Sequence, residues 1–200
     1  MYQSYQNLPF SNTFTGKYVG GYFYFSAFNY FYKTYSNFGI ISSYKNNGSR
    51  YRQIAYDSAT SKFYVGSEAL FRIDIFDSSC FLLQSISLAS KPYGLVSLNG
   101  NIYASLVNST EILVIQNGMV GKYFTVNQCL TNSYQVMSIT TDSFGNLAIS
   151  CSATGQIVVY DSNGNYMNTS IQVQAYPYIS AIDSYGRFVV MTHISLEIYT

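Results

Sequence analysis

The residue types that most often carry catalysis or hold metals are scarce in this chain. His193 is its only histidine, and nine carboxylates and three cysteines make up the rest of that set. Catalytic zinc usually takes three protein ligands, most often including several histidines, so a histidine-based zinc centre is ruled out. A Ser-His-Asp triad needs one histidine, but the chain has no Gly-x-Ser-x-Gly nucleophile motif. We therefore expect His193 to be a turn or rim residue.

Aspartates recur where one apolar segment turns into the next. Asp57, Asp142 and Asp183 fall at equivalent places along the chain. A ring of such carboxylates would offer the oxygen ligands that calcium prefers, and Asp142 and Asp183 would be the ligands. Aspartate also accepts hydrogen bonds from the backbone just after it and so stabilises turns. We favour the turn role, and predict neither a bound metal nor a cofactor.

These aspartates belong to a repeat of about forty residues that runs along the chain. Its members include Lys91–Ala104, Tyr134–Ile149 and Tyr178–Val190, each of which reads as an apolar strand, a turn and a second apolar strand. The fullest unit continues through a third strand over 156–160 and a hairpin at 161–165 to a fourth strand over 166–173. Short strands repeated at this period are typical of a β-propeller, in which four antiparallel strands make one blade.

The repeats predict one all-β domain over residues 1–200, with units of roughly 11–48, 49–89, 90–132, 133–174 and 175–200. The last unit ends at its third strand, and residues 1–10 have the spacing of a fourth strand. We therefore predict five blades, with Tyr2–Phe10 completing the last one and removing an exposed sheet edge. The alternative is a fragment of a six- or seven-bladed ring.

A column of tyrosines begins the first strand of successive units. Its members are Tyr51, Tyr93, Tyr134 and Tyr178, with Phe14 as an approximate fifth, and the cations Arg50, Arg52 and Lys91 flank it. In a closed ring these side chains would surround one mouth of the central channel. Tyrosine offers a flat apolar face and a hydroxyl, which suits a protein or glycan partner, and the cations suit an anionic group. The alternative is that the aromatic rings pack between neighbouring blades.

Two segments carry a family resemblance. Lys91-Pro92-Tyr93-Gly94-Leu95-Val96 with Asn99-Gly100-Asn101, and Asp142-Ser143-Phe144-Gly145-Asn146 with the strand that ends at Asp161, resemble the NHL and YVTN-like propeller repeats. The resemblance is good over 90–174 and weak before 50. It implies a ring-shaped propeller used mainly for binding, and it does not carry one activity.

Composition narrows the class of protein further. The net charge is +1 with only ten basic residues, which does not favour nucleic-acid binding. No apolar run is long enough to span a bilayer. Low charge and a high content of tyrosine, asparagine and serine favour an extracellular module of a longer protein. The three Asn-x-Ser/Thr sequons, at Asn47, Asn108 and Asn168, are compatible with glycosylation, but chance alone accounts for their number.

The three cysteines, Cys80, Cys129 and Cys151, match no zinc spacing. We expect them to be small buried apolar residues, and the alternative is one disulfide with a free thiol.

The function expected from these features is a non-catalytic binding or scaffold module, a propeller that presents its channel mouth to a protein or glycan. The binding residues would be Tyr51, Tyr93, Tyr134, Tyr178, Arg50, Arg52 and Lys91. The alternative is a propeller enzyme, namely a metal-assisted hydrolase, lactonase or lyase.

Overall fold

The chain folds into antiparallel sheets of short strands. The computed structural model describes residues 13–48, 50–129, 137–142, 144–173, 177, 179–182, 187–191 and 196–199. The first sheet contains β1 (Thr13–Val19), β2 (Tyr22–Ala27), β3 (Tyr30–Thr34) and β4 (Ile40–Lys45). The second contains β5 (Tyr51–Asp57), β6 (Lys62–Ser67), β7 (Arg72–Phe76) and β8 (Leu82–Ser87).

The remaining sheets follow the same plan. The third contains β9 (Pro92–Leu98), β10 (Asn101–Leu106), β11 (Glu111–Gln116) and β12 (Met119–Thr125), after which comes the 3₁₀ turn η1 (Asn127–Cys129). The fourth contains β13 (Met137–Thr141), β14 (Leu147–Cys151), β15 (Gln156–Tyr160) and β16 (Tyr166–Gln172). The last has β17 (Ile179–Ile182), β18 (Phe188–Met191) and β19 (Leu196–Tyr199) as its described strands.

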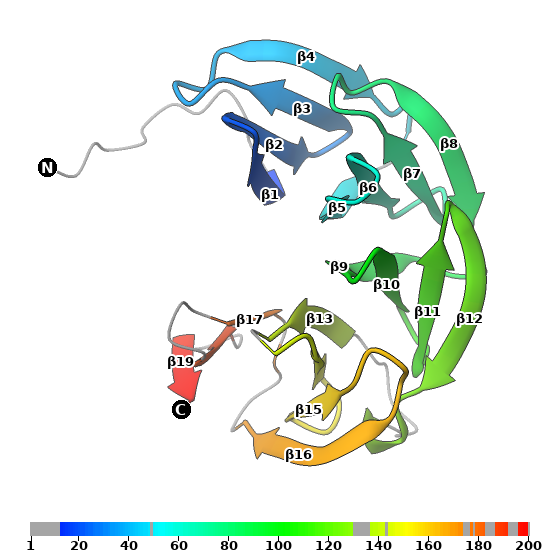
Figure 1. The fold of residues 1–200 in the computed structure, drawn as a ribbon, viewed down its shortest axis with the longest axis vertical. Coiled ribbons are helices and arrows are strands. Elements are labelled where there is room, and N and C mark those ends of the chain that lie inside the picture. Colours follow the sequence, from blue (N-terminus) through cyan, green and yellow to red (C-terminus); the bar gives the residue numbers. More distant parts are fainter. Residues whose placement is uncertain are drawn as a thin grey trace, which may run out of the picture.

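The sheets stand side by side in an arc, with the first strand of each sheet innermost and the fourth outermost (Figure 1). The innermost strands β1, β5, β9, β13 and β17 touch their neighbours in chain order. This radial arrangement confirms the prediction of a β-propeller. The predicted five-blade closure depends on residues 2–10, which lie outside the described residues, so it stays a prediction.

Asparagine and glycine make the tight hairpins that join strands within a blade. Asn99-Gly100 links β9 to β10 and Asn117-Gly118 links β11 to β12, and all four residues have positive φ, between 52° and 78°. Two successive positive φ angles define the type I′ turn, whose twist matches that of the flanking strands. The sequence places these residues where the backbone needs them.

The apolar core lies between sheets. One cluster joins Phe31 and Tyr24 of the first sheet to Phe63 and Phe76 of the second, and similar clusters join each later pair of sheets. Because an inner blade is packed on both faces, every residue of β14 is buried. Such strands read as continuous apolar runs rather than alternating ones.

A buried carboxylate holds the strands of the second sheet together. Asp74 is fully buried, and it accepts hydrogen bonds of 2.6 Å from both the Tyr51 hydroxyl and the Ser85 hydroxyl. Arg72 Nε lies 2.8 Å from Asp74 Oδ1. The charge is therefore paired and fully hydrogen-bonded, as a buried carboxylate must be.

The cysteines correct the first expectation. Cys129 and Cys151 form a disulfide with a Cα–Cα distance of 5.2 Å, and Cys80 is a buried free thiol. Thus the pair is not simply two small apolar residues, and the alternative of one disulfide with a free thiol is correct. The 3₁₀ turn η1 carries Cys129 to the end of β14, a placement that cysteine spacing alone does not reveal.

Candidate functional site

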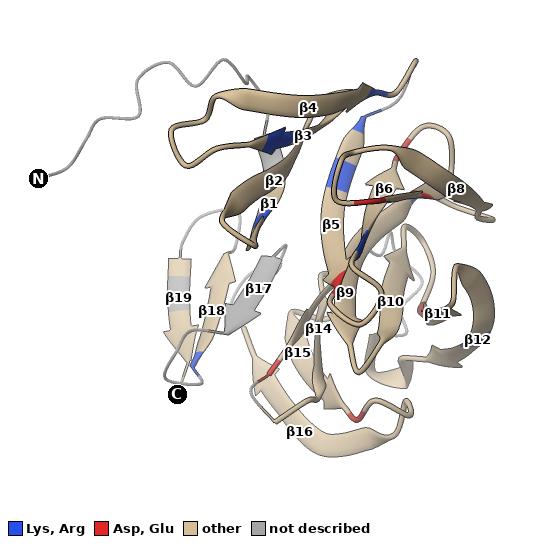
Figure 2. Cartoon of the chain, turned by 45° about the horizontal axis from the view of Figure 1, so that its top comes forward, with Lys and Arg blue, Asp and Glu red and all other residues tan. Residues whose placement is uncertain are grey.

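A cleft lies where the strands of the first three sheets begin and end. Its volume is about 400 Å³, and it is lined by Phe28, Asn29, Gly48, Arg50, Glu68, Ala69 and Lys91. Arg50 precedes β5, Glu68 follows β6, and Lys91 precedes β9. Figure 2 shows basic residues at the end of β4 and at the beginning of β5, on this side of the molecule. The cleft therefore draws its side chains from several blades.

Backbone hydrogen bonds fix the rim of the cleft. The Glu68 N–H donates to the Arg50 carbonyl at 2.9 Å, and the Tyr51 N–H donates to the Phe28 carbonyl at 2.6 Å. Beneath them, the Asn46 side-chain amide donates to the Ser67 hydroxyl at 3.0 Å in a buried position. The loops that carry Arg50 and Glu68 are thus held in register before any ligand arrives.

The Glu68 carboxylate is surrounded by the positively charged side chains at the cleft. Arg52 donates to both of its carboxylate oxygens, through Nε at 2.9 Å and Nη2 at 3.3 Å. Lys91 Nζ lies 3.9 Å from Oε1. The hydrogen bond from Arg52 is the main cause that lowers the pKa of Glu68, against the opposing effect of burial, and the charges of Arg52, Lys91 and Arg50 lower it further. Glu68 is therefore ionised at neutral pH.

Aromatic rings support two of the cations. The Arg52 guanidinium lies 5.7 Å from the centre of the Tyr93 ring, and the Arg50 guanidinium lies 5.3 Å from the centre of the Phe28 ring. Both distances are in the range of cation–π attraction. The sequence-predicted residues Arg50, Arg52, Lys91 and Tyr93 therefore gather at one place on the molecule.

Tyr51, another tyrosine of the predicted column, does not join them. Tyr51 is fully buried against Asp74, and burial strongly raises the pKa of its hydroxyl. Its ring packs between the first two sheets, because the residue that begins an inner strand faces the neighbouring blade. Tyr134 and Tyr178 lie outside the described residues.

The aspartates proposed as metal ligands show a turn role where they are described. Asp142 accepts hydrogen bonds from the N–H groups of Phe144 and Asn146 at 2.9 and 2.7 Å, and from the Asn146 side chain at 2.8 Å. Asp183 and His193 lie outside the described residues. Within the described ranges, no group of three or more histidine, cysteine or acidic side chains is placed to hold a metal ion.

Glu68 is the residue that sequence reasoning missed. Its signal was its position just after the second strand of its unit. Since consecutive strands are antiparallel, that position lies beside the residue that precedes the first strand, here Arg50. The sequence had already placed Arg50, Arg52 and Lys91 at this end of the blades. The antiparallel register of β5 and β6 places the Glu68 carboxylate at the same end.

Comparison with known proteins identifies the fold class. No protein-family model matches the chain, and no curated protein matches its sequence. Solved structures do match, and they include a WD40 β-propeller domain and lyases of the same fold. The chain is therefore a β-propeller. The NHL resemblance itself is not confirmed. In the described residues, no helix has the length and apolar character needed to cross a membrane.

The similar structures include enzymes. A streptogramin B lyase superposes with a TM-score of 0.76 at 15% identity, covering 96% of this chain and 70% of its own. A catalytically inactive histidine-to-alanine variant of virginiamycin B lyase from Staphylococcus aureus, with quinupristin, has a TM-score of 0.75 at 14% identity, covering 100% and 72%. The WD40 propeller domain of Doa1 has a TM-score of 0.73 at 12% identity, covering 92% and 61%.

These neighbours correct the expected function. The non-catalytic scaffold was the leading interpretation, because the residue types that usually carry catalysis are scarce in the chain. Lyases with the same fold contradict it and favour the enzyme alternative. At such low identity the likeness itself shows only the fold.

Proposed function

We propose that this chain is a propeller enzyme of the lyase class, which eliminates a leaving group from an anionic substrate bound in the cleft of Arg50, Glu68 and Lys91. The observation that supports the proposal is the meeting of one ionised carboxylate with cations from two blades in a cleft of about 400 Å³. Lyases of the same fold support the class of reaction.

Each group has a role in this proposal. Glu68 accepts a proton from the carbon next to a substrate carbonyl. The electron pair of the broken C–H bond forms a carbon–carbon double bond as the leaving group departs. Lys91 and Arg50 stabilise the negative charge that develops on the carbonyl oxygen. Arg52 positions Glu68 and keeps it ionised, and ionised Glu68 is the form that accepts a proton.

The reaction of this chain would not copy that of its neighbour. The virginiamycin B lyase variant was inactivated by loss of a histidine, whereas this chain has only His193. The carboxylate–lysine pair supplies the proton acceptor and the positive charge without a histidine.

An elimination assay tests the proposal. The purified protein is incubated with a uronic-acid oligosaccharide, which is anionic, and the new double bond conjugated to a carbonyl is followed by ultraviolet absorbance. We expect Glu68→Gln to lower kcat/KM by at least about 100-fold, in the range for loss of a general base, and Lys91→Met to lower it by a similar factor.

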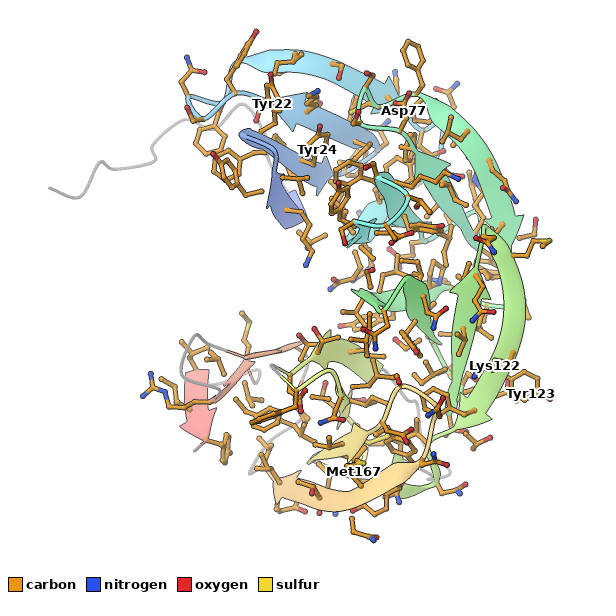
Figure 3. The ribbon with its side chains drawn as sticks, in the orientation of Figure 1. Tyr22, Tyr24, Asp77, Lys122, Tyr123 and Met167 are labelled. Carbon is orange, nitrogen blue, oxygen red and sulfur yellow. A yellow bond between two sulfur atoms is a disulfide. The ribbon has the colours of Figure 1, made fainter. Side chains whose placement is uncertain are left out.

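Lys122→Met is the matched control, because Lys122 lies on the outermost strand β12, away from the cleft (Figure 3). It should leave the rate unchanged. Equal rates in the wild type, Glu68→Gln and Lys91→Met would show that the cleft is not the active site. No elimination from this oligosaccharide would contradict the proposed lyase activity on an anionic substrate of this class.

A further inference from the structure

The last described sheet has one packed face and one exposed apolar face. Val190 is fully buried against the fourth sheet, together with partly buried Phe188. Since side chains alternate along a strand, Met191 points to the other face, where Leu196 is its directly paired neighbour. Ile198, the partner of Val189, shares that face. Met191, Leu196 and Ile198 are 46%, 66% and 54% exposed.

The opposite end of the arc has the same asymmetry. Tyr24 and Phe31 of the first sheet pack on the second sheet. Phe23 and Phe25 lie on the other face, in a separate apolar cluster whose described members belong to the first sheet. The Tyr18 ring packs at a tilt against the Phe23 ring with ring centres 4.8 Å apart, and Tyr18 is 62% exposed.

These two faces bound the opening of the arc. In Figure 1 the first sheet and the last sheet stand on either side of it, and the first strands of the sheets between them touch in chain order. Inner blades such as the one that holds β14 are covered on both faces. Among the described residues, it is the two ends of the arc that present an apolar face to the opening.

We propose that the ring does not close with five blades, and that at least one further four-stranded blade, apolar on both faces and part of the same polypeptide, fills this opening. An occupant that touches both ends must bury Tyr18 on one side and Leu196 and Ile198 on the other. A blade of this chain's own kind does so, because its two faces are apolar and a sheet packs on a sheet.

Two observations favour the same polypeptide as the source. Every junction between described sheets is made by consecutive units of one chain. The similar lyases are also longer: 96% of this chain aligns with only 70% of the streptogramin B lyase, so about 30% of that chain has no counterpart here. The proposal stands independently of the proposed function.

The first test uses the 200-residue chain. Leu196→Lys and Ile198→Lys should each leave the thermal unfolding midpoint within about 2 °C of wild type and reduce binding of a fluorescent apolar dye, because the face is exposed. Val190→Lys, the matched change on the packed face, should unfold the protein. Strong destabilisation by Leu196→Lys or Ile198→Lys would show that the chain itself covers this face, and would overturn the proposal.

The second test uses the protein in the cells that make it. An immunoblot should show a polypeptide larger than 22.5 kDa by at least roughly 4–5 kDa, the mass of one repeat of about forty residues. A native polypeptide of 22.5 kDa would overturn the proposal. A Tyr18→Cys/Ile198→Cys double variant gives a further check. If a short cross-linker joined its two thiols, the two ends of the arc would lie against each other, and the proposal would be overturned.

Discussion

At the scale of single residues, the charge of the cleft depends on how cations from neighbouring loops surround the Glu68 carboxylate. Arg52 binds both oxygens of Glu68, and Lys91 lies near one of them. A forked guanidinium matches a carboxylate in a way that a lysine ammonium does not. Arg52 is therefore the positioning residue, while Lys91 and Arg50 line the cleft.

Removing Arg52 should raise the pKa of Glu68. In the wild type the folded pKa lies below the ordinary value, so the ion pair stabilises the fold fully above the ordinary glutamate pKa, and this stabilisation is lost as pH falls through the folded pKa. Arg52→Met should raise that pKa and cost about 1 kcal/mol at neutral pH, as for a partly exposed pair.

The measurement is a ¹³C NMR titration of the Glu68 carboxylate. Arg52→Lys should keep part of the effect and Lys122→Met none of it. An unchanged Glu68 pKa in Arg52→Met would mean that other charges hold the carboxylate in its ionised form.

At the scale of elements, glycine sets how closely one blade approaches the next. Gly94 lies in β9, and its N–H donates to the Ser105 hydroxyl at 2.9 Å. A Cβ at this position would lie 2.8 Å from Ser105 Oγ and 3.0 Å from the Ile139 nitrogen of β13. The third and fourth blades therefore meet where a side chain has no room.

Gly94→Ala should lower the free energy of unfolding by about 1–3 kcal/mol, the usual cost of overpacking, as measured by urea denaturation. Gly121→Ala in the outer strand β12 is the control, because the nearest atom to its Cβ would be 3.6 Å away. It should be close to neutral. Equal stability of the two variants would show that the inner strands adjust at little cost.

At the scale of the whole molecule, stability is a sum over neighbouring blades. Each inner blade is held on both faces, whereas the two ends of the arc are not held in the same way. In repeat architectures a unit is stabilised mainly by its interfaces with the units beside it. The ends of the arc should therefore open more readily than its middle.

Hydrogen-exchange mass spectrometry should show this gradient. Peptides from β10, β11, β14 and β15 should exchange most slowly, and those from β18 and β19 should exchange at least about tenfold faster, since they lose one interface. Uniform protection along the chain would mean that the protein opens as a single unit.

The sequence by itself determined the architecture, because that information is local. Short apolar strands, Asn-Gly hairpins and a forty-residue period specify four-stranded blades without reference to distant contacts. Even the cations of the cleft were found, since they flank a repeated tyrosine position.

Only the tertiary structure decided which of these residues meet. The placement of Glu68 between Arg52 and Lys91, the burial of Tyr51 on Asp74, and the pairing of Cys129 with Cys151 all join residues from separate strands or blades. A repeat pattern predicts the same environment for equivalent positions in every blade. The neighbours of each position differ from blade to blade, so one tyrosine of the column lies in the core while another supports the cleft.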